Sequence, residues 1–292
     1  MAKSRGETVF YWANLSFLII VSFLCAAPVI HIVAVSFSSN DAVAAGLVSF
    51  WPKEFTWTGY DYVLQNERFW RTMGNSILRI LLGVPFNLLC SALVAYPLSK
   101  SNARFRPRTL YAWIFFLTMI LQASLIPSYI VVKELGLMDN IWSLILPKAV
   151  TVFYVLVLLN FFRNVPGELE EAAMMEGGSQ WTILFKVYLP LSKAAFATLA
   201  VFSILDHWNS WFDGMIYMSN PDQYPLLTYL QNATIQLDMS KLSAEEVQRL
   251  SKIGTQTNNA VQILLASLPV MLSYPFLQKY FTKGMVLGSV KG

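Results

Sequence analysis

The chain has 292 residues, of which 55% are hydrophobic and only 13% are charged. An ordinary soluble domain has roughly 25% charged residues, because its surface must interact with water. The composition therefore argues against a water-soluble fold and indicates a membrane protein. The formal net charge of +4 does not indicate a nucleic-acid binder, because many of the basic residues flank apolar runs. Lipid headgroups and membrane topology account for basic residues in such places.

The cysteines and histidines argue against a metal site. Cys25 and Cys90 lie inside apolar runs, where a thiol usually packs as a small hydrophobic group. His31 and His207 are the only histidines, so the His and Cys spacing of a usual zinc site does not occur. We predict no metal and no cofactor in this chain.

Several apolar runs are long enough to cross a membrane as helices. A hydrocarbon core of roughly 30 Å needs about 20 residues at about 1.5 Å per residue. Without water to satisfy the backbone, each such run must be helical. The sequence predicts an all-α membrane protein with six transmembrane helices in one domain over residues 1–292. The predicted spans are residues 14–37, 73–98, 110–132, 141–162, 194–218 and 260–281.

The basic residues set the expected orientation in the membrane. The segment between the second and third spans has no acidic residue, and it carries Lys100, Arg104, Arg106 and Arg108. Because cytoplasmic loops carry an excess of Lys and Arg, we expect this segment and both termini to be cytoplasmic. The first run is longer than a signal-peptide core of about 7 to 15 residues, so we expect it to be retained.

With this orientation, residues 163–193 form a large cytoplasmic loop. Pro166 and the glutamates that follow it suit the first turn of a helix. Gly177 and Gly178 would end that helix and permit a tight turn. A second short helix is predicted beyond the turn, with Trp181, Leu184 and Tyr188 at helical spacing on one face. Such an amphipathic knob is expected to fit a groove on another protein.

This loop resembles the EAA signature of binding-protein-dependent ABC importers. The pattern is Glu-Ala-Ala, three residues, a glycine, nine residues, an aliphatic residue, one more residue and Leu-Pro. The sequence departs from it slightly, with Val187 where isoleucine is commoner and Glu176 where aspartate is usual. An ordinary interfacial loop is the alternative interpretation. The resemblance implies that the loop couples the chain to an ATPase through Glu171, Ala172, Ala173, Gly177, Leu189 and Pro190.

The whole chain also looks like the carbohydrate-type permeases, particularly the second membrane subunit of the maltose importer. The resemblance implies a type I ABC importer permease in the bacterial cytoplasmic (inner) membrane. Its partners would be a second permease subunit, two ATPase subunits, an extracytoplasmic solute-binding protein and an oligosaccharide. No Gly-Lys-Ser/Thr phosphate loop occurs in the sequence, so we expect no catalytic residue here, with ATP and Mg on the separate ATPase.

The tail at 282–292 resembles those that reach between the ATPases of sugar importers. Gly284, Gly288 and Gly292 favour a flexible cytoplasmic extension over a helix.

The fifth predicted span contains polar and ionisable groups, which are costly at membrane depth and normally face a cavity or the bundle interior. Aromatic faces and planar hydrogen-bonding groups commonly hold sugars. We therefore expect the substrate pathway to involve Arg79, Asp206, Trp208, Asn209, Trp211 and Asp213.

Two alternatives remain open for this span. The tryptophans could form an interfacial aromatic belt, and Arg79 could pair with Asp206 or Asp213 instead of binding an acidic sugar. The stretch also resembles permeases for uronate-containing oligosaccharides such as alginate.

The main rival function is a secondary sugar transporter driven by an ion gradient, which would need membrane carboxylates for ion coupling. A structural membrane protein is a second rival, for which the EAA-like loop would have no purpose. Transport that requires a separate ATPase distinguishes all three.

Overall fold

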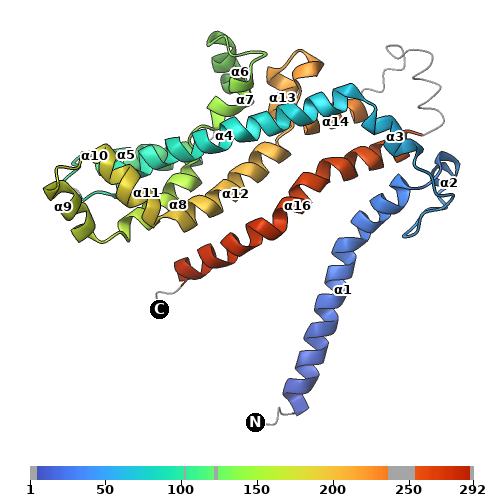
Figure 1. The fold of residues 1–292 in the computed structure, drawn as a ribbon, viewed down its shortest axis with the longest axis horizontal. Helices are drawn as coiled ribbons and strands as arrows, with labels where there is room; N and C mark the ends of the chain where they lie inside the picture. The colour runs from blue at the N-terminus through green and yellow to red at the C-terminus, as the bar shows by residue number, and fades with distance from the viewer. Residues whose placement is uncertain (1–4, 102, 122–123, 236–253, 290–292) are drawn as a thin grey trace. The chain divides into compact units, whose positions relative to one another are not determined.

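The computed structural model describes residues 5–101, 103–121, 124–235 and 254–289. The regular elements within these ranges are all helices, which confirms the all-α prediction (Figure 1). The chain divides into two compact units. One comprises residues 1–70 and 232–268, and the other comprises residues 71–231 and 269–292.

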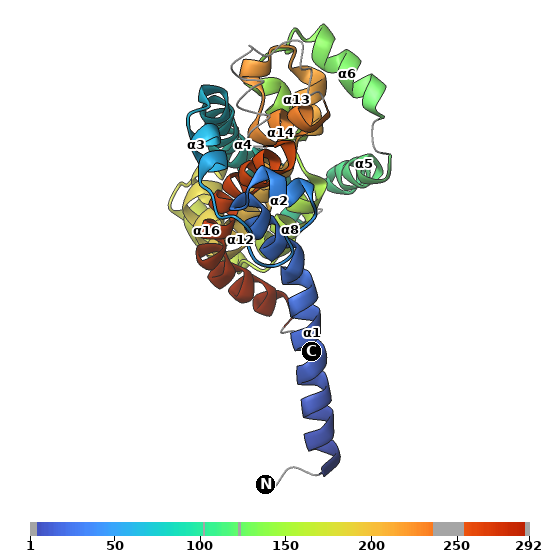
Figure 2. The same ribbon diagram turned by 90° about the vertical axis from the view of Figure 1, so that its right-hand side faces the viewer.

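The first unit begins with α1 (Arg5–Ser36), one unbroken helix that covers the first predicted span except for its last residue (Figure 2). Its apolar side chains are largely exposed, as expected of a helix that contacts lipid. Two short helices follow, α2 (Asn40–Ala44) and α3 (Thr58–Leu64). A small apolar core joins the end of α1 to the α2 region, and it consists of Ala34, Val35, Ala42, Val43, Val48 and Ala260.

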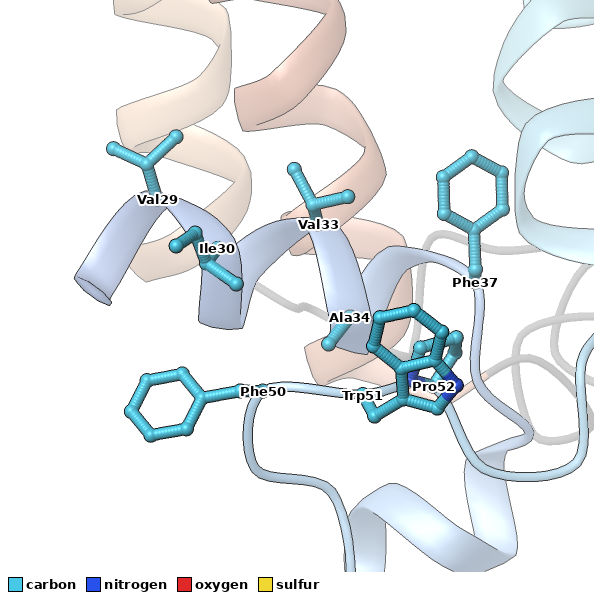
Figure 3. A pocket seen from close by; sticks show the side chains of 8 residues that line it. All are labelled: Val29, Ile30, Val33, Ala34, Phe37, Phe50, Trp51 and Pro52. Carbon is cyan, nitrogen blue, oxygen red and sulfur yellow. The ribbon is translucent and has the colours of Figure 1, made fainter. Parts of the chain in front are cut away.

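An apolar pocket of about 250 Å³ lies beside this core (Figure 3). Its lining comes from the last turns of α1 and from residues 50–52, and His31 holds the two parts together through a 2.7 Å hydrogen bond between Nδ1 and the Ser49 carbonyl. His31 is therefore a structural contact at the end of a helix. The lining residues are Val29, Ile30, Val33, Ala34, Phe37, Phe50, Trp51 and Pro52.

The second unit contains most of α4 (Glu67–Ser99), the other continuous helix in the described residues that is long and apolar enough to cross a membrane. Three bent helix pairs pass the same test when each pair is counted as one span. The first pair is α5 (Arg108–Ile120) with α6 (Leu125–Glu134). In the second pair, α7 (Ile141–Ile145) and η1 (Leu146–Lys148) are followed by α8 (Val152–Arg163). The third pair joins the segment Gln180–Leu191 to α12 (Lys193–Asn209).

The third, fourth and fifth predicted spans are therefore bent or broken within the described residues. Proline explains two of the breaks, because it has no N–H to continue a helix. Pro127 lies in the first turn of α6, and Pro147 lies in η1, where the axis bends by 52° before α8. The fifth run breaks between α12 and α13 (Phe212–Tyr217), at Ser210 and Trp211.

The core of the second unit lies where α4, α8 and α12 meet the loop at residues 163–193. Its fully buried members include Leu158 and Phe162 on α8, Leu199 on α12, and Ile183 in the loop. Burial of such side chains stabilises the unit by roughly 1.5–3 kcal/mol for each one. The loop is thus packed into the same core as the membrane helices, so it is held as part of this unit.

The last helix, α16 (Thr255–Ser289), contains the sixth predicted span. Its side chains beyond residue 273 lie outside the described ones, so the count of six spans stays a prediction. The helix continues through Gly284 and Gly288, so the expectation that the tail leaves the helix there is wrong. An interior glycine costs only about 0.5–1 kcal/mol, and extending an existing helix needs no new nucleus. Residues 290–292 lie outside the described part of the chain.

Candidate functional site

The first half of the loop at residues 163–193, which is predicted to be cytoplasmic, forms the helix that the sequence predicts. Helix α9 (Gly167–Met175) follows Pro166 at its N-cap, with Glu168 and Glu170 in its first turn. These glutamates lie at the positive end of the helix dipole, which favours negative charge.

The helix ends in a Schellman motif made by its two glycines. The Gly177 amide donates to the Met174 carbonyl (2.9 Å), and the Gly178 amide donates to the Ala173 carbonyl (2.8 Å). Gly177 has a φ of +78°, which side chains with a Cβ rarely adopt. A Cβ on Gly178 would lie 2.6 Å from the Ala173 carbonyl oxygen. The turn therefore requires glycine at both positions, for different reasons.

The second half of the loop is helical but irregular. It consists of α10 (Gln180–Ile183), the π-helical η2 (Leu184–Tyr188) and α11 (Leu189–Leu191). Leu184 and Tyr188 are buried as predicted, whereas Trp181 is 62% exposed and stacks on Phe185. The prediction that Trp181 shares their face is wrong. The buried side of this segment falls at Ile183 and Leu184, so Trp181 lies outside it.

The six residues of the EAA pattern lie on this loop at different depths. Glu171, Ala172, Gly177 and Pro190 are exposed, whereas Ala173 and Leu189 are half-buried against the core. Glu171 accepts a hydrogen bond from Arg104 Nη2 at 3.3 Å. The exposed side of the loop thus carries charged and apolar groups, and its other side packs against the core.

The residue before the motif, Glu170, is buried and was not among the predicted site residues. Its carboxylate accepts hydrogen bonds from Lys100 Nζ (2.8 Å) and from the Tyr188 hydroxyl (2.7 Å), and Arg104 Nη1 lies 3.0 Å away. Lys100 follows the last residue of α4, and its ammonium also lies over the rings of Tyr96 and Tyr188, 4.0 and 4.2 Å from their centroids. We call Glu170, Lys100 and Tyr188 the loop clamp.

Burial raises the pKa of the Glu170 carboxyl. The hydrogen bonds from Lys100 and Tyr188, together with the charges of Lys100 and Arg104, outweigh burial and hold this pKa below its usual value. Burial lowers the pKa of the Lys100 ammonium, which Glu170 opposes. Glu170 therefore stays ionised at neutral pH, and Lys100 and Arg104 neutralise its charge.

A second polar cluster lies where α4 and α12 run side by side (Figure 1), and it contains the predicted pathway residue Arg79. Arg79 is fully buried and forms a bidentate pair with Asp213, with Nη1 3.1 Å from Oδ1 and Nη2 also donating to Oδ2. It further donates to His207 Nδ1 and to the carbonyls of Leu144 and Ser210, each at 3.2 Å.

These contacts use all five donors of the Arg79 guanidinium, so none remains for an acidic sugar in this structure. Of the two partners considered for Arg79, Asp213 is the one observed. The break between α12 and α13 is held at this point, because Arg79 binds both the Ser210 carbonyl and the Asp213 side chain.

His207 is buried between Arg79 and Asn87. Because Arg79 only donates, His207 Nδ1 must accept, and Nε2 carries the proton donated to Asn87 Oδ1 at 2.8 Å. Gly83 allows the ring to lie against α4, since a Cβ there would lie 2.6 Å from His207 Nε2. His207 therefore acts as a neutral link between α4 and α12.

The other predicted pathway residues do not form one surface. Asp206 is exposed and lies 3.6 Å from Lys148 Nζ, which donates to Ser210 Oγ at 2.9 Å. Trp208 is buried, Asn209 is exposed, and Trp211 is half-buried against Phe212. The structure brings Arg79, Asp206 and Asp213 into one charged network through Lys148, and it leaves Trp208 in the interior.

Long apolar helices and a loop with the EAA pattern on a glycine turn define a type I ABC importer permease. Residues 66–287 match the family described as binding-protein-dependent transport system inner membrane component, and the chain belongs to this family. It is therefore a multi-pass membrane subunit of an importer. This confirms the resemblance identified on the loop, and family membership gives no support to a secondary transporter.

Similar proteins occur in Bacillus subtilis (strain 168). Protein LplC is 37% identical over 100% of this chain and 98% of its own length. The polygalacturonan/rhamnogalacturonan transport system permease protein YtcP is 34% identical over 94% of this chain and 96% of its own length. Among solved structures, a chain of a bacterial ABC transporter involved in the import of the acidic polysaccharide alginate matches with a TM-score of 0.89. It is 31% identical and covers 96% of this chain and 99% of its own.

Proposed function

We propose that this chain is one permease subunit of an ATP-driven oligosaccharide importer, and that its EAA loop docks on a separate ATPase subunit. The observation that carries the proposal is the loop itself, with an exposed outer face on a Schellman turn and an inner face packed into the core of the second unit. A groove-binding knob needs both properties. The other partners would be a second permease subunit, a second ATPase and an extracytoplasmic solute-binding protein.

The test is reconstitution of the importer in vesicles after co-purification from its native membrane. Uptake of the oligosaccharide should require ATP and Mg bound by the co-purified ATPase. Uptake that instead follows an imposed ion gradient without ATP would contradict the proposal and favour a secondary transporter.

We propose a uronate-containing oligosaccharide, alginate-like or pectic, as the substrate class. The names of the alginate transporter and of YtcP support it. Competition between charged and neutral oligosaccharides for uptake by the reconstituted importer tests this class. Equal competition by both would overturn it.

Asn209 is the exposed polar residue that we propose for contact with a sugar hydroxyl. Replacing Asn209 with leucine should weaken apparent affinity about two- to tenfold, because one hydrogen bond is worth roughly 0.5–1.5 kcal/mol. Asn160→Leu, at an exposed position on α8, is the matched control and should leave uptake unchanged. Unchanged uptake by both variants would remove Asn209 from the pathway and favour the aromatic-belt interpretation of the neighbouring tryptophans.

The proposed orientation places both termini in the cytoplasm. A reporter fused near Asn102 should be cytoplasmic and one near Ser240 external, because Arg104, Arg106 and Arg108 flank the first position. Both fusion sites lie outside the described residues. The reverse pattern of reporter accessibility would overturn the orientation and the coupling role of the loop with it.

A further inference from the structure

We infer that the loop clamp formed by Glu170, Lys100 and Tyr188 is the mechanical link that transmits movement of the EAA loop to α4. The inference rests on the proposed docking function and names residues outside the EAA pattern. These are positioning residues, because they act through the exposed loop surface and do not form it.

The clamp ties three elements together at one buried point. Glu170 comes from α9, Tyr188 from η2, and Lys100 from the end of α4. The Tyr188 hydroxyl accepts from Lys100 Nζ at 3.1 Å while donating to Glu170, so each member contacts the other two. Glu170 and Lys100 are 4% and 8% exposed. Neither half of the loop can move relative to α4 without breaking a buried, charged hydrogen bond.

The end of α4 holds the second half of the loop at another position as well. Tyr96 donates to Gln180 Oε1 at 2.7 Å, and its ring meets the Tyr188 ring edge-on with centroids 5.1 Å apart. Gln180 begins α10 and Tyr188 ends η2, so α4 contacts both ends of this segment. The segment is therefore fixed in direction as well as in position.

The same helix reaches the second polar cluster. Arg79 and Lys100 are separated by 21 positions, which corresponds to about 32 Å along a helix at about 1.5 Å per residue. Arg79 holds the break between α12 and α13. A displacement of the docked loop would thus reach the pathway side of the unit through one continuous element.

The alternative is that the clamp only stabilises the fold. Replacing a buried polar network by apolar groups of similar size is often neutral for stability, but apolar contacts are non-directional and would no longer fix the loop against α4. A variant with all three polar groups replaced therefore separates the two roles.

The experiment uses the complete importer in vesicles and measures uptake per ATP hydrolysed. The variant Lys100→Met/Glu170→Met/Tyr188→Phe should co-purify with the ATPase and unfold near the wild-type temperature, but its uptake per ATP should fall at least fivefold. The matched control, Arg71→Met/Asp222→Met, removes one positive and one negative charge from an exposed ion pair of the same unit that lies outside the loop, and it should keep the wild-type ratio.

A wild-type ratio in the triple variant would overturn the clamp as a link. If that variant does not assemble, Glu170→Gln gives the same comparison, because it keeps the shape and removes the charge. It should lower uptake per ATP at least twofold, and an unchanged ratio would again overturn the inference. Failure of the proposed function looks different, because the wild-type importer itself would then show no ATP-dependent uptake.

Discussion

Replacing Asp213 with asparagine is expected to destabilise the protein by about 3–5 kcal/mol, the usual cost of breaking a buried ion pair from one side. The Arg79 guanidinium is fully buried and would keep its charge while losing the carboxylate that neutralises it. The α12–α13 break would also lose a contact that fixes it. The measurement is thermal unfolding of the purified protein in detergent.

The control is Asp222→Asn, which breaks the ion pair between Arg71 and Asp222 at 3.3 Å. Both of those side chains are about half exposed, at 51% and 41%, so the expected loss is only about 0–1 kcal/mol. The double variant Arg79→Met/Asp213→Leu should recover much of the stability that Asp213→Asn loses, since no charge is left stranded. Equal destabilisation by Asp213→Asn and Asp222→Asn would contradict the buried pairing.

Replacing Gly177 with valine is expected to uncouple uptake from ATP hydrolysis while leaving insertion in the membrane intact. At a φ of +78°, a β-branched residue adds strain of about 1–3 kcal/mol, which corresponds to about a 5- to 150-fold shift away from the observed turn. Nothing lies within 4 Å of a Cβ built at this position, so the effect comes from the backbone and not from a clash. The measurement is uptake per ATP in the reconstituted importer.

Two further variants test that explanation. Gly177→Asn should retain most of the coupling, because asparagine tolerates the left-handed region better than other residues with a Cβ. Gly167→Val changes a glycine of the same loop that has neither a positive φ nor a close neighbour at its Cβ, and it should behave as wild type. Normal coupling in the Gly177→Val variant would count against the docking role of the loop.

The helices of the membrane spans could be predicted because hydrophobic length is a local property of the sequence. The breaks within these spans were harder to predict from the sequence. Pro147 marks one break, yet proline also occurs inside intact helices such as α1 and α4. The break at Ser210 carries no helix-breaking residue, and it is held by Arg79 from another helix. Composition therefore located the apolar runs, and prolines mark two of their bends, but no local signal marks the break at Ser210.

The glycine turn of the loop shows what the sequence by itself determined. Its conformation depends on hydrogen bonds between residues three to five positions apart, so Gly177 could be recognised from the EAA spacing alone. The tertiary structure decided the partners of the charged residues. Glu170 meets Lys100 across 70 positions, and Arg79 meets Asp213 across 134. A sequence pattern can show that such charges need partners, but only the packing of helices against one another brings a particular pair within hydrogen-bonding distance and excludes water from it.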